Sequence, residues 1–419
     1  MAREMKDSGI EWIGEMPKEW EIKKLKYLSL FQQEKYDEVY GDLVYIGLEN
    51  VESWSGIYIE TDSIYDKSQA LIFHNNDILW GKLRPYLAKV YQCTNMGCCS
   101  SEFCVISLDK MSDIRFFWYL LVSPTFVDTV NRSTYGTKMP RANADFIKNM
   151  HVPIPSIIEQ SIISQFLDNK CKEIDNILTK TRASIEEYKK LKQAVITQAV
   201  TKGIRGNREM KDSRSTWFGQ IPSDWNMRKI KYIFKIQKDI AGEEGHAVLS
   251  ITQKGIKPKD LSKNEGQLAE NYSNYQLVHI GDFAMNHMDL LTGWVDVSQY
   301  EGVTSPDYRV FGLIDKDNYC SQYYLYLMQM CYTNRIFYGL GQGVSGLGRW
   351  RLQADKFLNF SITVPSYEEQ KDIANYLDKK CSAIDELIAK KEQYLFEIEN
   401  YKKSLIYEYV TGKKEVPQE

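Results

Sequence analysis

Cysteine and histidine are the residue types in this sequence that could hold a metal ion or transfer protons. The cysteines form one dense group, which comprises Cys93, Cys98, Cys99 and Cys104. Its spacing differs from the roughly two to four residues that separate the ligands of a typical zinc site. The histidines are scattered along the chain, at His74, His151, His246, His279 and His287. We therefore expect reduced thiols and no metal site.

Motifs for enzymatic chemistry are missing from the sequence. It has no GxxxxGK[ST] phosphate loop, no H-E-x-x-H, no GxSxG, and no Asp/Asn-Pro-Pro-aromatic motif of amino-methyltransferases. We predict a chain that is not catalytic by itself and has no catalytic residues. A nuclease that uses scattered carboxylates stays open as an alternative, and metal-dependent cleavage by the purified chain would reveal it.

A long polar helix is predicted twice, over residues 156–202 and again over 366–412. The two copies align without a gap at an offset of 210 residues. Identical pairs include Ser156/Ser366, Glu159/Glu369, Gln160/Gln370, Ile163/Ile373, Leu167/Leu377, Asp168/Asp378, Cys171/Cys381, Ile174/Ile384 and Asp175/Asp385. Each copy follows a proline, has a serine that can cap the helix, and carries a glutamate three residues later, as in a capping box.

Apolar residues in both copies recur with the spacing of a coiled coil. The predicted seam is Ile163, Leu167, Ile174, Ile177, Tyr188, Leu191 and Val195 in the first copy, and Ile373, Leu377, Ile384, Leu387, Tyr394, Ile398, Tyr401 and Leu405 in the second. The partner of each copy is expected to be the other copy, running antiparallel. Each helix would be up to roughly 70 Å long at ~1.5 Å per residue.

A second repeat precedes each helix. Residues 5–28 return at 210–233 with an offset of 205, and the shared residues include Trp12/Trp217, Pro17/Pro222 and Trp20/Trp225. Short β-like runs alternate with helical stretches in both halves, which indicates an α+β fold with two pseudo-repeated mixed α/β domains. The predicted boundaries are a first domain at 1–155, a helix at 156–202, a second domain at 203–365, a helix at 366–412 and a tail at 413–419.

These repeats resemble the DNA-specificity subunit of type I restriction-modification systems. The resemblance rests on the tandem W-x-G-x-x-P-x-x-W openings at 12–20 and 217–225 and on the P-x-x-x-E-Q-x-x-I-x-x-x-L-D start of each helix. It covers almost the whole chain. In that family two target-recognition domains each read one half of a split, non-palindromic DNA sequence, and the helices set the unspecified spacer.

The resemblance also implies partners. Two methyltransferase subunits would dock on the helices, and restriction subunits with motor and nuclease activity would join them. Adenine N6 methylation, and cleavage of unmodified sites, would then be performed by those partners. S-adenosylmethionine, ATP and Mg²⁺ would accordingly belong to partner subunits, with no cofactor bound by this chain and double-stranded DNA as its target.

Candidate DNA-binding residues are those where the two halves differ, because shared residues should serve the common framework or the phosphates. In the first domain the candidates are Lys82, Arg84, Tyr86, Lys89, Arg132, Lys138, Arg141 and Asn143. In the second domain they are Asn286, His287, Arg349, Arg351 and Gln353. Their donor groups suit base edges or phosphates.

The pair Arg141 and Arg351 is a special case because it repeats. Each arginine either contacts a phosphate or bonds to the aspartate four residues on, which is Asp145 or Asp355. The repeat alone does not choose between these two interpretations.

The net charge of −3 does not by itself indicate a nucleic-acid binder, although local basic faces can exist on an acidic chain. A coiled-coil scaffold that binds protein partners is therefore the alternative function. A steep dependence of binding on salt would distinguish DNA binding from protein docking. No apolar run is long enough to span a membrane, and we expect a cytoplasmic protein with no membrane partner.

Overall fold

The computed structural model describes residues 3–62, 66–136, 138–260, 271–343 and 350–417. The chain divides into two compact units. Unit 1 comprises Met1–Arg182 and Gln393–Glu419, and unit 2 comprises Ala183–Glu392. Each unit therefore holds one globular domain together with part of both long helices.

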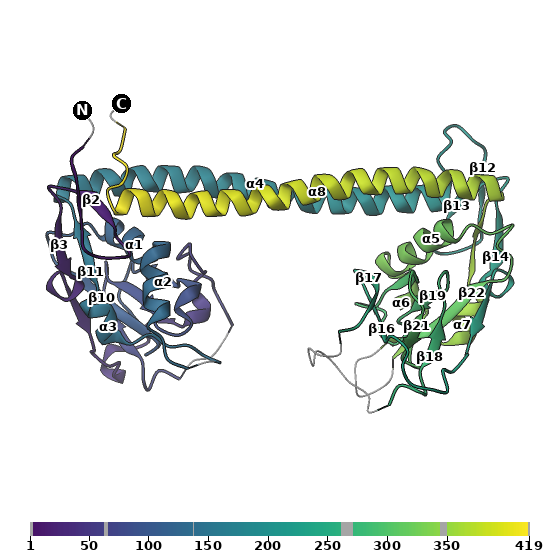
Figure 1. Ribbon diagram of the computed structural model, residues 1–419, viewed down its shortest axis with the longest axis horizontal. Coiled ribbons are helices and arrows are strands. Elements are labelled where there is room, and N and C mark those ends of the chain that lie inside the picture. Colours follow the sequence, from purple (N-terminus) through teal and green to yellow (C-terminus); the bar gives the residue numbers. More distant parts are fainter. Residues whose placement is uncertain (1–2, 63–65, 137, 261–270, 344–349, 418–419) are drawn as a thin grey trace. The chain divides into compact units, whose positions relative to one another are not determined.

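Short strands form the framework of unit 1 (Figure 1). An antiparallel four-stranded sheet has the order β4 (Ser29–Gln32), β10 (Phe103–Leu108), β7 (Ile78–Gly81), β8 (Val90–Gln92). A three-stranded sheet has the order β5 (Tyr45–Ile46), β9 (Gly97–Cys99), β6 (Leu71–Phe73). Two further pairs are β1 (Met5–Asp7) with β2 (Glu15–Pro17), and β3 (Glu21–Lys24) with β11 (His151–Ile154).

Three short helices complete the domain of unit 1. They are α1 (Ile114–Val122), α2 (Pro124–Arg132) and α3 (Ala144–Asn149). Asp113 caps α1 by accepting a hydrogen bond from the Phe116 amide. The Trp80 indole donates to the Leu121 carbonyl at 3.1 Å, and the Trp118 indole donates to the Val90 carbonyl at 2.9 Å. These bonds tie α1 to the four-stranded sheet and satisfy the polar atoms of two buried indoles.

Unit 2 repeats this plan. Its four-stranded sheet has the order β15 (Phe234–Gln237), β22 (Arg309–Leu313), β19 (Phe283–Met285), β20 (Val295–Val297). The other pairs are β12 (Met210–Asp212) with β13 (Gln220–Pro222), β14 (Asn226–Lys229) with β25 (Ser361–Val364), β16 (Leu249–Thr252) with β17 (Gly255–Pro258), β18 (Gln276–Val278) with β21 (Gly302–Thr304), and β23 (Gln342–Gly343) with β24 (Trp350–Arg351). Its short helices are α5 (Ser321–Thr333), α6 (Ile336–Leu340) and α7 (Ala354–Asn359).

The two long helices are α4 (Ile157–Lys202), with 46 residues, and α8 (Tyr367–Val410), with 44 residues. A glycine with positive φ follows each helix: Gly203, at 76°, comes directly after α4, and Gly412, at 72°, lies two residues after the end of α8. A left-handed residue just after a helix is the usual glycine C-terminal cap. In unit 1 a side chain at Gly412 would also collide with Pro17, because the end of α8 lies against β2.

Ion pairs show that the long helices run antiparallel in unit 1 and lie side by side in unit 2. In unit 1, Lys402 bonds to Asp175 at 2.7 Å and Arg182 bonds to Glu399 at 2.6 Å, so partner numbers fall as α4 advances. In unit 2, Lys192 lies 2.7 Å from Asp385. The expected α+β fold with two repeated domains and an antiparallel helix pair is confirmed.

The predicted seam is correct near the helix starts and at Leu405 of α8, but wrong at several positions between them. Ile163, Leu167 and Ile174 are buried on α4, but Ile177 and Leu191 are exposed. The buried positions that continue the α4 stripe are Leu178, Thr181 and Ile185. On α8, Leu387, Tyr394 and Tyr401 are likewise exposed. A helix of 3.6 residues per turn drifts relative to a strict seven-residue repeat, so the buried stripe moves to neighbouring positions.

Across the described residues, the search for a membrane-crossing helix is negative: each helix is too short or too polar for that role.

Candidate nucleic-acid interface

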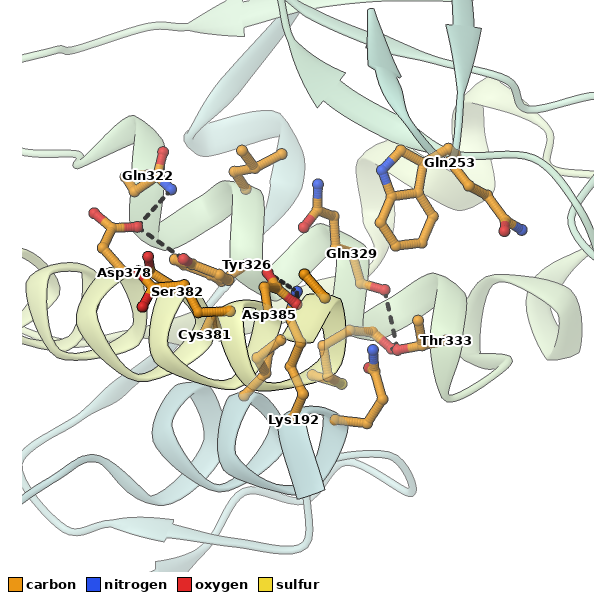
Figure 2. Close-up of a pocket in the computed structure, with 17 residues that line it drawn as sticks. Lys192, Gln253, Gln322, Tyr326, Gln329, Thr333, Asp378, Cys381, Ser382 and Asp385 are labelled. Atoms are coloured by element: carbon orange, nitrogen blue, oxygen red, sulfur yellow. Dashed lines mark hydrogen bonds and ion pairs between the residues drawn. The ribbon is translucent and has the colours of Figure 1, made fainter. Parts of the chain in front are cut away.

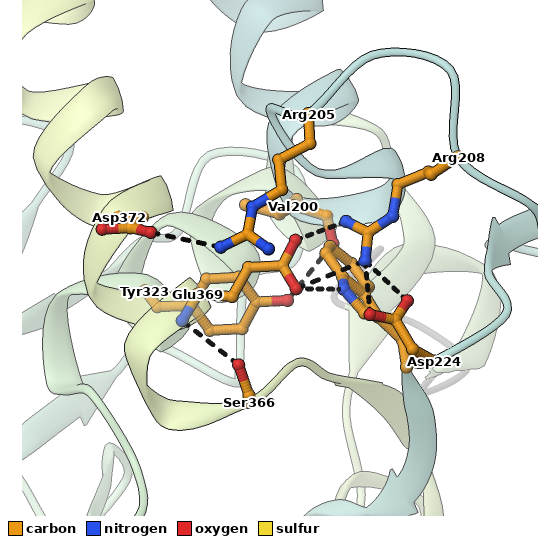
Figure 3. A network of polar contacts seen from close by, with 9 residues as sticks. Val200, Arg205, Arg208, Asp224, Tyr323, Ser366, Glu369 and Asp372 are labelled. Atoms are coloured by element: carbon orange, nitrogen blue, oxygen red, sulfur yellow. Dashed lines mark hydrogen bonds and ion pairs between the residues drawn. The ribbon is translucent and has the colours of Figure 1, made fainter.

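A buried polar network fixes the start of α8 to the domain of unit 2 (Figure 3). The Trp225 indole donates to Glu369 at 2.9 Å, and Arg208 forms ion pairs with both Glu369 and Asp224. The Glu369 amide donates to the Ser366 hydroxyl, which caps the helix, at 3.3 Å. Only half of the predicted capping box therefore forms, because the glutamate carboxylate turns away from Ser366 and toward the tryptophan and arginine.

Unit 1 contains the same network at the start of α4. The Trp20 indole donates to Glu159 at 2.9 Å, and Arg3 lies 2.5 Å from both Glu159 and Glu19. The second tryptophan of each repeated opening is thus a buried anchor for the helix glutamate. These shared residues form the common framework, and the residues that differ between the halves are carried on it.

An open groove lies in unit 2 between α5 and the long helices, with a volume of about 890 Å³ (Figure 2). Asp378 accepts hydrogen bonds from Gln322 and from the Tyr326 hydroxyl on its wall, at 2.9 and 2.7 Å. Trp294 and Gln253 reach it from the domain side. The groove is lined by residues of the shared helices as well as of the domain.

Two candidates in unit 1, Arg84 and Arg141, come together through the backbone. Arg84 donates its amide to Pro140 at 2.7 Å, and an isolated antiparallel bridge joins Leu83 to Arg141. Arg84 is exposed and left-handed, at φ 51° and ψ 62°, and it precedes the short 3-10 helix Pro85–Leu87. A left-handed arginine costs conformational energy and is found where surrounding structure holds it, often at functional sites.

Neighbouring candidates in the same segment differ in their freedom. Tyr86 is 44% exposed, and Lys82, four residues before it, is half-buried. Lys89 instead points inward, where its ammonium donates to the carbonyls of Leu48 and Val51 at 2.7 and 2.8 Å. Burial lowers the pKa of Lys89. The structure therefore gives Lys89 an internal role in holding the 48–51 turn.

The later candidates of unit 1 lie on its surface. Arg132 ends α2 and is 3.6 Å from Glu11, with most of its side chain exposed. Lys138 is exposed in the turn before α3. Asn143 caps α3, because its side chain accepts the Asp145 amide at 2.8 Å.

The structural alternative for Arg141, a bond to Asp145, is wrong. Arg141 pairs with Glu102 at 2.9 Å, across the turn before β10. The bridge to Leu83 turns this segment into a strand-like edge, which directs the arginine toward that turn rather than along α3.

Unit 2 brings three of its candidates to one cavity. His287, Arg351 and Gln353 line a space of about 350 Å³ beside β15 and β22. The Leu352 amide donates to the His287 carbonyl at 3.0 Å, which fixes the two segments to each other. Asn286 instead closes a turn by accepting the Met288 and Asp289 amides at 3.2 Å. Arg349 lies outside the described residues.

Sequence reasoning missed Arg309 and Lys238, which line the same cavity. Arg309 lies on β22 and is only 5% exposed. The sequence carries a signal, since Arg309 directly precedes the apolar residues Val310 and Phe311. Burial lowers the pKa of Arg309 to about 10, and burial with the charges of Arg309 and Arg351 lowers that of His287 to about 3. Arg309 is thus charged and His287 neutral at pH 7.

Comparison with known proteins gives a consistent family. A family model described as the type I restriction modification DNA specificity domain matches residues 17–187 and 222–397. The type I restriction enzyme MjaVIII specificity subunit of Methanocaldococcus jannaschii is 26% identical over 317 residues, 72% of this chain and 70% of its own. The putative MjaX specificity subunit of the same organism is 24% identical over 417 residues, covering 94% of this chain and 84% of the relative.

Two solved structures share the fold. One, described as the structural basis of complex assembly and conformational transition of the type I R-M system, aligns with a TM-score of 0.73 at 15% identity, over 95% of this chain and 99% of that chain. The other is the HsdS subunit from Thermoanaerobacter tengcongensis, with a TM-score of 0.51 at 16% identity, over 95% and 98% of the two chains.

Proposed function

This chain belongs to the family of type I restriction-modification DNA specificity proteins, and from that premise we propose that its two domains each read one half of a split, asymmetric DNA site. One observation carries the proposal. The two units share a framework, from the tryptophan–glutamate anchors to the order of the four-stranded sheets, but present different side chains at 82–89 and 285–294. A shared frame with different donors suits two different half-sites.

We further propose that this chain selects the site and that partners perform the chemistry. Two methyltransferase subunits would methylate adenine N6 and would carry S-adenosylmethionine, and restriction subunits would carry ATP and Mg²⁺. The proposal is supported by family membership. Because the target is DNA, we place the protein in the cytoplasm. Family membership favours DNA recognition over the alternative of a protein scaffold.

The decisive experiment is single-molecule sequencing of genomic N6-methyladenine in the source cell with and without this gene. The expected result is loss of one motif with two short asymmetric blocks around an unspecified gap. Co-purification of a methyltransferase subunit with the tagged chain tests the partner separately. If the methylation pattern stays unchanged while the methyltransferase co-purifies and transcripts of both genes are present, the proposal of a bipartite specificity role fails.

A further inference from the structure

We propose that the cavity formed by Arg309, Arg351 and His287 in unit 2 binds one phosphate of the DNA backbone, and that unit 1 has no equivalent site. The inference rests on the proposed DNA-binding function and assigns a role that the family match does not give to any residue. It concerns affinity and not the sequence that is read, because phosphate contacts position a protein on the duplex without distinguishing bases.

The lining of this cavity is cationic and lacks carboxylates. It has a volume of about 350 Å³ and is lined by Ile236, Lys238, Ile240, Gln276, His287, Pro306, Tyr308, Arg309, Arg351, Gln353 and Ala354. Three of these side chains carry a positive charge at pH 7, and none is acidic. Among the described residues, neither Arg309 nor Arg351 forms an ion pair.

Several polar nitrogen atoms of the residues that line the cavity are buried and have no hydrogen-bond partner among the described residues. Arg309 is 5% exposed and donates through Nη2 to the Leu352 carbonyl at 2.8 Å, but its Nη1 has no partner within the described chain. His287 is also 5% exposed, and its Nδ1 lacks a partner, as does Nε of Arg351. A buried charged donor without an acceptor costs folding free energy, so an incoming acceptor would be bound strongly.

Phosphate fits this donor set better than a base edge does. A phosphodiester brings a negative charge and only acceptor atoms, and arginine forks bind its oxygens in pairs. A base edge is neutral and would leave the charges of Arg309, Arg351 and Lys238 unbalanced. The Arg309 guanidinium already lies 4.9 Å from the Phe357 ring, which holds it in place for an incoming group.

Unit 1 supplies an internal comparison at the same position. Arg141 corresponds to Arg351 at the offset of 210, but it is neutralised by Glu102 at 2.9 Å. At the offset of 205, the place of Arg309 is taken by Cys104 and that of His287 by Lys82. In unit 1 the carboxylate of Glu102 thus neutralises the repeated arginine, as a bound phosphate would do in unit 2.

The test uses the full-length chain purified with its methyltransferase partner. Binding to a cognate and to an unrelated duplex is measured across a salt series for wild type, Arg351→Gln and the matched variant Arg141→Gln. Arg351→Gln should weaken both duplexes by the same factor, roughly ten-fold or more at low salt, as for a charged hydrogen bond. It should also reduce the salt slope by about 1, whereas Arg141→Gln, whose charge Glu102 already balances, should reduce the slope by less.

Further variants keep the result interpretable. Arg351→Lys retains the charge and should recover most of the slope, and Lys238→Gln, at the exposed rim, should reduce affinity without affecting folding. Melting curves identify any variant that fails to fold. Inorganic phosphate could stabilise the wild-type chain in melting curves while Arg351→Gln leaves the salt slope of DNA binding unchanged. That combination would assign the cavity to a free anion and overturn the proposal.

Other outcomes also overturn it. Loss for the cognate duplex alone would identify a base contact. Loss of the methyltransferase from the complex with intact DNA affinity would identify a partner carboxylate as the occupant. Failure of the proposed function is distinguishable, because the wild-type complex itself would then show no preference for the cognate duplex.

Discussion

The indole nitrogen of Trp225 lies 2.9 Å from Oε2 of Glu369, and the same bond of the same length joins Trp20 to Glu159. The two tryptophans therefore repeat in the sequence because each one bonds to a glutamate that repeats in the long helix. The bond links the residue just before β3 or β14 to the first turn of the helix that follows that domain.

Replacing Glu369 by Ala should destabilise unit 2 by about 3 kcal/mol, because Trp225 and Arg208 would lose a buried acceptor. The Glu369 side chain is 3% exposed, whereas that of Glu159 is 25% exposed. Glu159→Ala should therefore cost less. Urea unfolding measures both, with Glu368→Ala as a surface control that stays within about 0.5 kcal/mol of wild type. Equal losses for Glu368 and Glu369 would contradict the network.

Arg84→Ala should relax recognition at one half-site while sparing the other. A bidentate base contact by this exposed, left-handed arginine would cost about 1 to 3 kcal/mol. Binding of the methyltransferase complex to duplexes mutated in either half-site measures the effect. Lys110→Ala, at an exposed lysine of the same unit, is the control for loss of a surface charge. A uniform loss on every duplex would show that Arg84 contacts a phosphate instead.

A matched deletion of about seven residues within 175–195 and 385–405 should change the spacer and leave both half-sites intact. One heptad preserves the face that each helix presents to its partner. The pairs Asp175–Lys402 and Lys192–Asp385 show which positions must be removed together. Methylome sequencing of cells carrying the shortened gene reads the spacer directly. A changed half-site would refute the role of the helices in setting the gap.

Stability should fall as the pH drops from about 6.5 toward 3, in part because of His287. Its pKa is lowered to about 3 in the folded chain by burial and by Arg309 and Arg351, against about 6.5 when unfolded. Between these values the unfolded state binds a proton that the folded state does not, so the free energy of unfolding rises with pH. The difference in the free energy of unfolding between wild type and His287→Gln should rise with pH by a value of the order of 1 kcal/mol per pH unit in this window. A flat difference from pH 4 to 7 would rule out the buried neutral imidazole.

The repeats made most of the architecture predictable. Identical residues at fixed offsets located both helices, their starts and the two domains, because a repeated fold must reuse the contacts that build it. Glu159 and Glu369 were recognised as special positions. Their partners Trp20 and Trp225 were found as a separate motif, and only the structure shows that the two motifs meet.

The site was less predictable, since the contacts of a single side chain depend on neighbours that are distant in sequence. The ammonium group of Lys89 is of a type that can donate to DNA, but it donates to two internal carbonyls instead. Arg141 and Arg351 share a position in the repeat but not a partner, because Glu102 reaches one and no described carboxylate reaches the other. Arg309 was missed because the sequence does not show that this residue is buried beside His287 and Arg351.

The composition of unit 1 has a consequence for synthesis. Unit 2 is one continuous stretch of chain, whereas unit 1 joins Met1–Arg182 to Gln393–Glu419. The Tyr407 hydroxyl donates to the Ile13 carbonyl, and Lys413 donates to that of Glu15, at 3.3 and 3.0 Å. At about 5 to 20 residues per second, the first domain waits roughly 10 to 50 seconds on the ribosome for the segment that completes it. Unit 2 is translated later but is thus the first unit that can complete its fold. A message truncated before the end of α8 leaves unit 1 without the α8 residues that cover its apolar core.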